Sequence, residues 1–141
     1  MFIIDNVKVD FILYPFTWLQ PFKIIHNCRL IHVDDIIPMK LQAVSNRFAK
    51  KDFYDIDILL ANYSLQEMLE IFKRKFPDID RGFLIHSLTH FDIADKEEDP
   101  ILLPASKSWE QVKSDLQDVV RRYTLSFKKY THLFPAIFPL P

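Results

Sequence analysis

A single glycine, Gly82, is the feature that most restricts what this chain of 141 residues can be. Proteins contain about 7% glycine on average. Glycine is needed in turns with positive φ and in loops that wrap phosphate groups, because it has no Cβ. The dinucleotide-binding fingerprint and the P-loop each need several glycines in a short run. The sequence therefore excludes both kinds of phosphate cradle.

The composition indicates a folded domain without disulfides. The chain is 49% hydrophobic and contains 13 Phe, which is ample material for a core, and its length fits one domain spanning residues 1–141. The only cysteine, Cys28, excludes an internal disulfide and a cysteine-based zinc site, and we expect it to be a small buried apolar residue. The formal net charge of −1 creates no overall field that attracts nucleic acid.

The longest uncharged stretch is too short to cross a membrane. It runs from Phe11 to Phe22, which is twelve residues, and contains two prolines. A transmembrane helix needs about 20 apolar residues. The first residues also lack the basic segment and cleavage site of a secretory signal. We therefore expect a cytoplasmic protein that does not enter the membrane.

The residue pattern predicts an α+β fold, with a small N-terminal β-sheet followed by a helical bundle. Residues 1–33 are rich in β-branched and aromatic residues and are predicted to form strands, with a turn at Asn27 and Cys28. Residues 34–130 follow a helical period, and residues 131–141 form a proline-rich tail. We expect Asp34 or Asp35 to cap the first helix, with Pro38 in its first turn.

Further capping residues mark where the later helices begin. Asp52 is the predicted N-cap of a helix over residues 53–61. Ser64 and Glu67 form a capping box for a helix that reaches residue 76. Asp80 caps a short helix over residues 81–88, residues 91–107 form a loop, and Ser108 opens the last long helix.

One group of charged residues stands out at the corner between the first two helices, namely Lys40, Arg47, Lys50, Lys51, Asp52 and Asp55. Lys40 and Arg47 are two helical turns apart, so they lie on one face of their helix. Lysine supplies a point charge and arginine a planar fork, and a carboxylate can hold either in place to bind a triphosphate. The alternative is a solvated corner whose ion pairs each contribute about 0–1 kcal/mol.

Three segments of this chain resemble the AbiEii/AbiGii toxin family of nucleotidyltransferases. They read Val7-Lys-Val-Asp-Phe-Ile-Leu, Asp35-Ile-Ile-Pro-Met-Lys-Leu-Gln-Ala43 and Arg47-Phe-Ala-Lys-Lys-Asp-Phe-Tyr-Asp-Ile-Asp-Ile-Leu-Leu60. The resemblance implies the later part of a polymerase-β-type nucleotidyltransferase fold. It also implies a nucleoside triphosphate as substrate and Mg²⁺ held by carboxylates.

The resemblance also assigns roles to individual residues. Asp10 matches a metal-binding, catalytic carboxylate, and Asp52 or Asp55 matches the acid of the family's final motif. Lys40 matches a lysine that contacts the nucleotide, and Arg47 stands where the family carries a basic residue. On charge alone, Lys51 joins Lys40 and Arg47 as a candidate for binding phosphate.

The chain departs from the family at its first motif, because no Gly-Gly-Thr or Gly-Ser turn with an Asp-x-Asp pair is present. We therefore expect a truncated family member that is inactive alone, or one completed by another polypeptide. The alternative is a non-catalytic interaction module that pairs with an antitoxin-like protein. We also expect self-association through exposed apolar residues of the N-terminal sheet, with Phe2, Ile4, Phe11 and Leu13 as candidates.

Two weaker patterns receive ordinary structural interpretations. His86 and His90 have the i, i+4 spacing of metal ligands, but the sequence places no third ligand beside them. Basic residues near the C-terminus are interpreted as a solvated helix face rather than an RNA-binding patch, namely Arg121, Arg122, Lys128 and Lys129.

Overall fold

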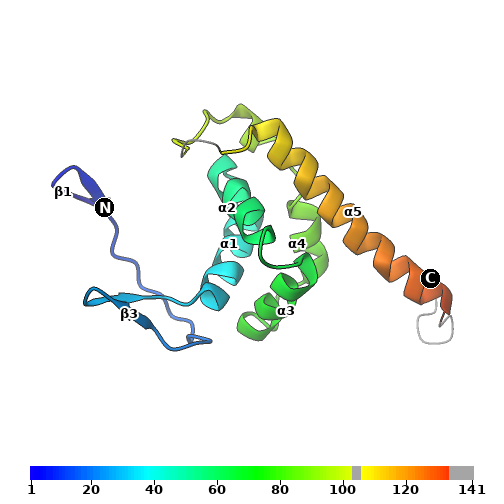
Figure 1. The fold of residues 1–141 in the computed structure, drawn as a ribbon, viewed down its shortest axis with the longest axis horizontal. Coiled ribbons are helices and arrows are strands. Elements are labelled where there is room, and N and C mark those ends of the chain that lie inside the picture. The colour runs from blue at the N-terminus through cyan, green and yellow to red at the C-terminus, as the bar shows by residue number, and fades with distance from the viewer. Residues whose placement is uncertain (103–105, 134–141) are drawn as a thin grey trace.

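Two β-hairpins precede five α-helices in the computed structural model, which describes residues 1–102 and 106–133 (Figure 1). This arrangement confirms the predicted α+β class. The strands are β1 (Phe2–Ile4), β2 (Val7–Val9), β3 (Lys23–Ile25) and β4 (Cys28–Leu30). The helices are α1 (Val33–Arg47), α2 (Lys50–Leu60), α3 (Leu65–Lys75), α4 (Arg81–Ser87) and α5 (Trp109–Leu133), with a short 3₁₀ turn, η1 (Ala94–Lys96).

The strands form two separate hairpins instead of the single sheet that the sequence predicts. Strand β1 pairs only with β2, and β3 only with β4, both antiparallel. Each hairpin turns through two residues with positive φ, Asp5 with Asn6 and His26 with Asn27. Turns with positive φ match the twist of the two paired strands. Among residues other than glycine, Asn, Asp and His adopt positive φ most readily. The predicted turn at Asn27 and Cys28 is thus shifted by one residue, and Cys28 is exposed rather than buried.

Helix α1 begins two or three residues earlier than a cap at Asp34 or Asp35 predicts, and neither aspartate caps it. Its N-cap is His32, whose Nδ1 accepts a hydrogen bond from the Asp34 amide at 3.1 Å. Pro38 therefore lies in the second turn rather than the first. The residues that α1 buries in the core are Ile37, Leu41 and Val44, which follow the i, i+4, i+7 spacing of one helix face.

The predicted starts of the later helices are confirmed except at α2. Ser64 and Glu67 form both hydrogen bonds of the capping box, Asp80 accepts from the Gly82 amide, and the Gln111 amide donates to Ser108. Helix α2, however, begins at Lys50 with Ala49 as its N-cap. Asp52 lies inside its first turn, because its side chain is engaged by Arg47 instead of by its own backbone.

The helices enclose one apolar core, and the N-terminal strands lie to one side of it (Figure 1). Helix α1 packs against α2, α3 and α4, and α5 packs across α2 and α3. The largest fully buried side chains come from all five helices and include Leu41, Phe53, Phe72, Leu84 and Leu116. The strand residues are almost all exposed. The predicted tail over residues 131–141 is wrong at its start, because α5 continues to Leu133. Its remainder, residues 134–141, and the side chains of Lys128 and Lys129 lie outside the described residues.

Candidate functional site

The chain turns sharply between α1 and α2, at the corner where the charged cluster was predicted. Helix α1 ends at Arg47, and the next residue, Phe48, adopts the left-handed conformation with φ of 52°. This C-terminal position is most often glycine, because other side chains are strained there. The strained turn at Phe48 places the last turn of α1 beside the first turn of α2.

Arg47 and Asp52 form the central contact of this corner. The Arg47 Nε and Nη2 atoms donate to the two Asp52 carboxylate oxygens at 2.6 and 2.8 Å. The Asp52 side chain is fully buried, whereas 54% of the Arg47 side chain is exposed. The hydrogen bonds to Asp52 outweigh burial and raise the pKa of Arg47 above its usual value. The guanidinium is therefore fixed through one edge, and its remaining N–H groups are left to other acceptors.

Lys40 completes the corner from the middle of α1. Its Nζ lies 2.6 Å from an Asp55 oxygen and 3.9 Å from an Asp52 oxygen. The Lys40 side chain is 34% exposed and the Asp55 side chain 40% exposed. The structure thus brings together four residues that the sequence analysis singled out, two cations of α1 and two carboxylates of α2.

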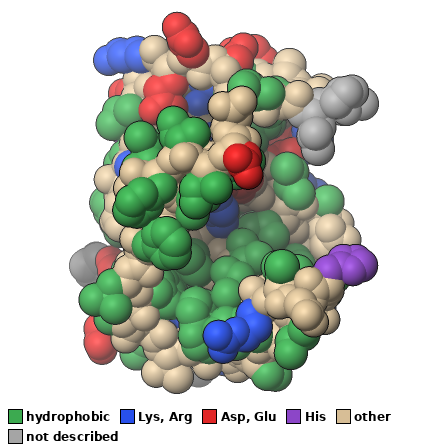
Figure 2. All heavy atoms as spheres, turned by 90° about the vertical axis from the view of Figure 1, so that its left-hand side faces the viewer, with side chains coloured by type: hydrophobic (Ala, Val, Ile, Leu, Met, Phe, Trp, Pro, Cys, Tyr) green, Lys and Arg blue, Asp and Glu red, His purple; other side chains and the backbone are tan. Residues whose placement is uncertain are grey.

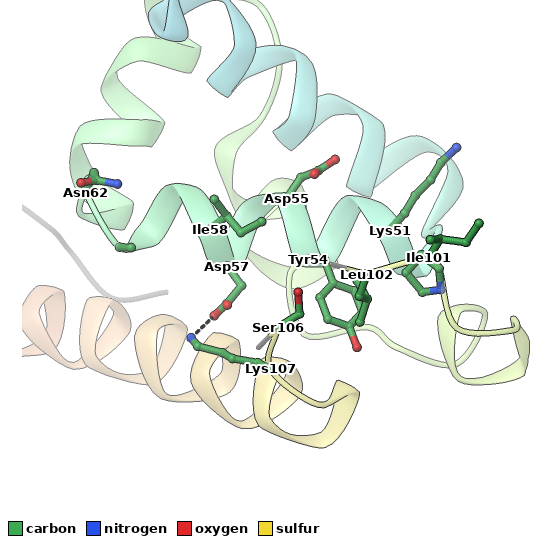
Figure 3. Close-up of a pocket in the computed structure, with 12 residues that line it drawn as sticks. Lys51, Tyr54, Asp55, Asp57, Ile58, Asn62, Ile101, Leu102, Ser106 and Lys107 are labelled. Atoms are coloured by element: carbon green, nitrogen blue, oxygen red, sulfur yellow. Dashed lines mark hydrogen bonds and ion pairs between the residues drawn. The ribbon is translucent and has the colours of Figure 1, made fainter. Parts of the chain in front are cut away.

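Neither of the two other lysines of the predicted cluster belongs to this group of four. Lys50 is buried and points to the loop after α4, where its Nζ donates to the Glu97 carbonyl oxygen and to Asp99, at 2.5 and 3.0 Å. It is a structural residue rather than part of an exposed cationic site. Lys51 is exposed and lines a pocket of about 520 Å³ formed by α2, the two residues that follow it and the loop that precedes α5. In Figure 3, Lys51 and Asp55 extend from one side of α2, while Asp57 reaches Lys107 on the other.

Asp10 lies apart from this corner. It follows β2, and its carboxylate lies 3.6 Å from Lys8 Nζ and 3.8 Å from the Met1 amino group. The hairpin β1–β2 stands well away from α1 and α2 in Figure 1. Within the described part of the chain, no three His, Cys, Asp or Glu side chains come together as metal ligands. Asp52 and Asp55 already face cations, so the residues gathered here do not fit a bound Mg²⁺.

Sequence reasoning missed the long-range ionic contacts that join distant elements, and three lysines make the main ones. Lys75 on α3 pairs with Asp35 on α1 at 2.5 Å, and the side chains are 1% and 0% exposed. Lys107 bridges Asp57 and Asp115, and Lys50 binds residues 97–99 as described above. The partners are 40 to 50 residues apart in the Lys75, Lys50 and Lys107–Asp57 contacts, so no local spacing could reveal them.

We compared the sequence with models of known protein families, and one family matches most of the chain. Residues 4–130 match the family described as nucleotidyl transferase AbiEii toxin of a type IV toxin–antitoxin system. The chain belongs to the AbiEii family. The match contains β2, the hairpin β3–β4, the α1–α2 corner and nearly all of α5. The resemblance drawn from the three sequence segments is thereby confirmed.

The AbiEii-family chain is also similar to an uncharacterized protein of Aquifex aeolicus (strain VF5). The two are 32% identical over 129 residues, which cover 87% of this chain and 60% of that relative. The chain therefore spans less than two thirds of the relative's length. No solved structure matches it significantly. Among the described residues, no helix is long and apolar enough to span a bilayer.

Proposed function

We propose that this chain is the nucleotide-binding, C-terminal part of an AbiEii-type nucleotidyltransferase. The observation that carries the proposal is the pair of cations, Lys40 and Arg47, that Asp52 and Asp55 hold on one exposed corner. The family match gives the chemistry, transfer of a nucleotidyl group. The corner supplies groups suited to the phosphates of a nucleoside triphosphate.

The geometry favours phosphate binding over a purely structural ion-pair cluster. Arg47 uses only Nε and Nη2 for Asp52 and keeps most of its side chain in solvent. A preorganised guanidinium loses little freedom when it binds an oxyanion through its other edge. Lys40 can exchange the half-exposed Asp55 for a phosphate oxygen, and Lys51 adds a third positive charge nearby on α2. Asp52 and Asp55 act here as positioning residues.

Nucleotide transfer requires more carboxylates than this corner offers. Transfer of a nucleotidyl group from a triphosphate requires groups that stabilise the charge developing in the transition state. Cations that bind only the ground state do not raise the rate. Asp52 and Asp55 are occupied by Arg47 and Lys40. We therefore propose that the chain alone is inactive as a transferase. In this proposal Asp10 binds Mg²⁺ together with carboxylates of a further segment. That segment belongs either to the same polypeptide or to a complementing one.

Nucleotide binding is tested by titrating the purified chain with a fluorescent nucleoside triphosphate. We expect Lys40→Ala to weaken binding at least tenfold, because it removes a direct phosphate contact. Lys73→Ala, an exposed lysine on α3, is the matched control and should bind like the wild type. Absence of binding by the wild type, or equal binding by Lys40→Ala, would leave the corner as a solvated ion-pair cluster.

Transfer is tested separately with nucleoside triphosphates labelled at the α-phosphate, in the presence of Mg²⁺ and of RNA or protein acceptors. We expect no label on either acceptor from this chain alone. Transfer that is lost in Asp10→Ala would overturn this expectation and make the chain a complete enzyme.

A second candidate function is a non-catalytic interaction module. The observation that favours it is the apolar surface of the N-terminal hairpins, where Phe2 is 58% exposed and Ile4 is 55% exposed. The family's toxin–antitoxin assignment makes an antitoxin-like protein the proposed partner, in the cytoplasm where nucleotides are found. Tight binding of such a partner without any nucleotide binding would favour this function over the first.

A further inference from the structure

Residues 14–20, which we call the strap, follow the hairpin β1–β2 and run to the helices; they contain Pro15 and are followed by Pro21. Unlike the strands, the strap touches the core. The Phe16 ring packs edge-on against Phe76 with centroids 4.9 Å apart, and Leu19 packs on the buried cluster. The strap is therefore the part of the N-terminal region that attaches it to the ends of α1 and α3.

The attachment is built around the buried Asp35 carboxylate. Besides Lys75, this carboxylate accepts hydrogen bonds from the backbone amides of Leu19 at 3.0 and 3.1 Å and of Gln20 at 3.2 Å. The neighbouring Asp34 accepts from the Gln20 side chain at 3.0 Å. An ionised carboxylate buried this deeply needs several donors, and two of the donors to Asp35 belong to the strap.

The Lys75 ammonium depends on the strap in the same way. It donates to the Thr17 carbonyl oxygen at 2.9 Å as well as to Asp35. It also lies 5.0 Å from the Tyr14 ring centroid and 4.9 Å from that of Trp18, and these two rings stack on each other. Aromatic faces attract a cation and keep water from it. Each charge is thus fully satisfied only while the strap is in place.

We infer that Asp35 and Lys75 form a latch whose function is to fasten the strap, and with it the hairpin β1–β2, to the helical bundle. The bundle does not need the latch for its own apolar core, which is made by other residues of α1 to α5. When the strap lifts, water can solvate both charges. The strap and the hairpin before it can therefore leave as a unit while the helices stay folded, and the latch sets where Asp10 lies relative to them.

The test uses the full chain labelled with 5-fluorotryptophan and ¹⁹F NMR. The chain has two tryptophans, so Trp18 reports on the strap and Trp109 on the bundle. The variant Trp18→Phe assigns the two resonances. The deciding variant is the double replacement Asp35→Leu with Lys75→Met, which keeps the side-chain volumes similar and leaves no unpaired charge in the core.

We expect the Trp18 resonance of the double variant to move to its position in urea, while the Trp109 resonance stays unchanged. Amide exchange at Leu19 and Gln20 should rise at least tenfold. Lys73→Met, an exposed lysine on the same helix as Lys75, should change neither resonance. A Trp18 resonance that stays in place would show that the strap does not need the latch. Movement of both resonances would show that the pair belongs to the core of the bundle, and would also overturn the inference.

Discussion

Individual charged residues at the α1–α2 corner differ in how deeply they are embedded. Asp52 is fully buried and depends on Arg47, whereas Asp55 and Lys40 face each other near the surface. A buried carboxylate that loses a donor has no water to replace that donor, so the folded state is destabilised. When a solvated ion pair is broken, water takes the place of the lost partner and little stability is lost. Replacing Arg47 should therefore affect mainly the stability of the fold, whereas replacing Lys40 should affect mainly nucleotide binding.

The residue-scale prediction on stability compares two alanine variants. Arg47→Ala should lower the free energy of unfolding by about 1.5–3 kcal/mol, because it strips both hydrogen bonds from Asp52. Lys40→Ala should lower it by only about 0–1 kcal/mol, because Asp55 is already half in water. Urea unfolding followed by circular dichroism measures both. Equal losses would contradict the proposed difference between the two pairs.

A second residue-scale prediction concerns the pH at which the strap is released. Burial by itself raises the pKa of Asp35, but hydrogen bonds from Lys75, Leu19 and Gln20 outweigh it and hold the pKa below its usual value. A lowered pKa stabilises the folded state above the unfolded carboxyl pKa of about 3.9, and this contribution is lost as the pH falls through the lower folded value.

The Trp18 resonance should therefore keep its folded position at pH 4 and shift only under more acidic conditions. The other ionisable groups beside the latch are Asp34, His32, Arg74 and Tyr14. The control is Tyr14→Phe, which should release the strap at the same pH as the wild type. It keeps the ring over Lys75 and removes a hydroxyl that has no hydrogen-bond partner in the described part of the chain. Release that begins above pH 5 would point to a group other than Asp35.

At the scale of elements, α3, α4 and α5 begin where the short side chains of Ser64, Asp80 and Ser108 accept hydrogen bonds from exposed backbone amides. Ser64 shows this most fully, since its hydroxyl accepts from the Glu67 amide at 3.2 Å and the Glu67 carboxylate accepts from the Ser64 amide at 2.8 Å. This exchange of hydrogen bonds fixes the first turn of α3, the helix that carries Lys75.

Ser64→Ala should lower the free energy of unfolding by about 1 kcal/mol, the usual loss for a serine N-cap. Thermal and urea unfolding measure the change. Ser114→Ala, an exposed serine inside α5, is the matched control and should be neutral or slightly stabilising, because alanine has the higher helix propensity. A loss of the same size in both variants would argue against a specific capping effect.

At the scale of the whole molecule, the apolar surface is unevenly distributed. Figure 2 shows hydrophobic side chains gathered around a hollow on the side that carries the hairpins. Phe11 is 80% exposed and Leu13 is 91% exposed. A two-stranded hairpin with open edges is marginal in water by itself. This face is therefore the part of the molecule most in need of a partner.

We predict that the chain associates with itself through this face at tens of micromolar. The double variant Phe11→Ser with Leu13→Ser should shift the mass measured by light scattering toward that of the monomer. Leu125→Ser, an exposed leucine on α5, is the control and should leave the mass unchanged. A strictly monomeric wild type at this concentration would contradict the prediction.

The order of strands and helices, the capping box and the charged corner were all determined by local sequence. Lys40 and Arg47 meet Asp52 and Asp55 because they stand within fifteen residues of one another on two consecutive helices, so helical periodicity and one turn bring them together. Where local signals competed, the sequence-based prediction was wrong. Asp52 and Asp35 both look like helix caps, but a buried carboxylate takes the strongest donors within reach.

Only the tertiary structure decided which distant donors those were and how the N-terminal residues are placed. Lys75 reaches Asp35 across 40 residues, and Lys50 reaches Glu97 across 47. The division of the predicted sheet into two hairpins, and the pairing of Asp10 with Lys8 and the Met1 amino group, are also seen only in the tertiary structure. Periodicity assigns residues to faces of a helix or strand. Which faces then meet depends on how the whole core packs and on which buried charges can be satisfied there.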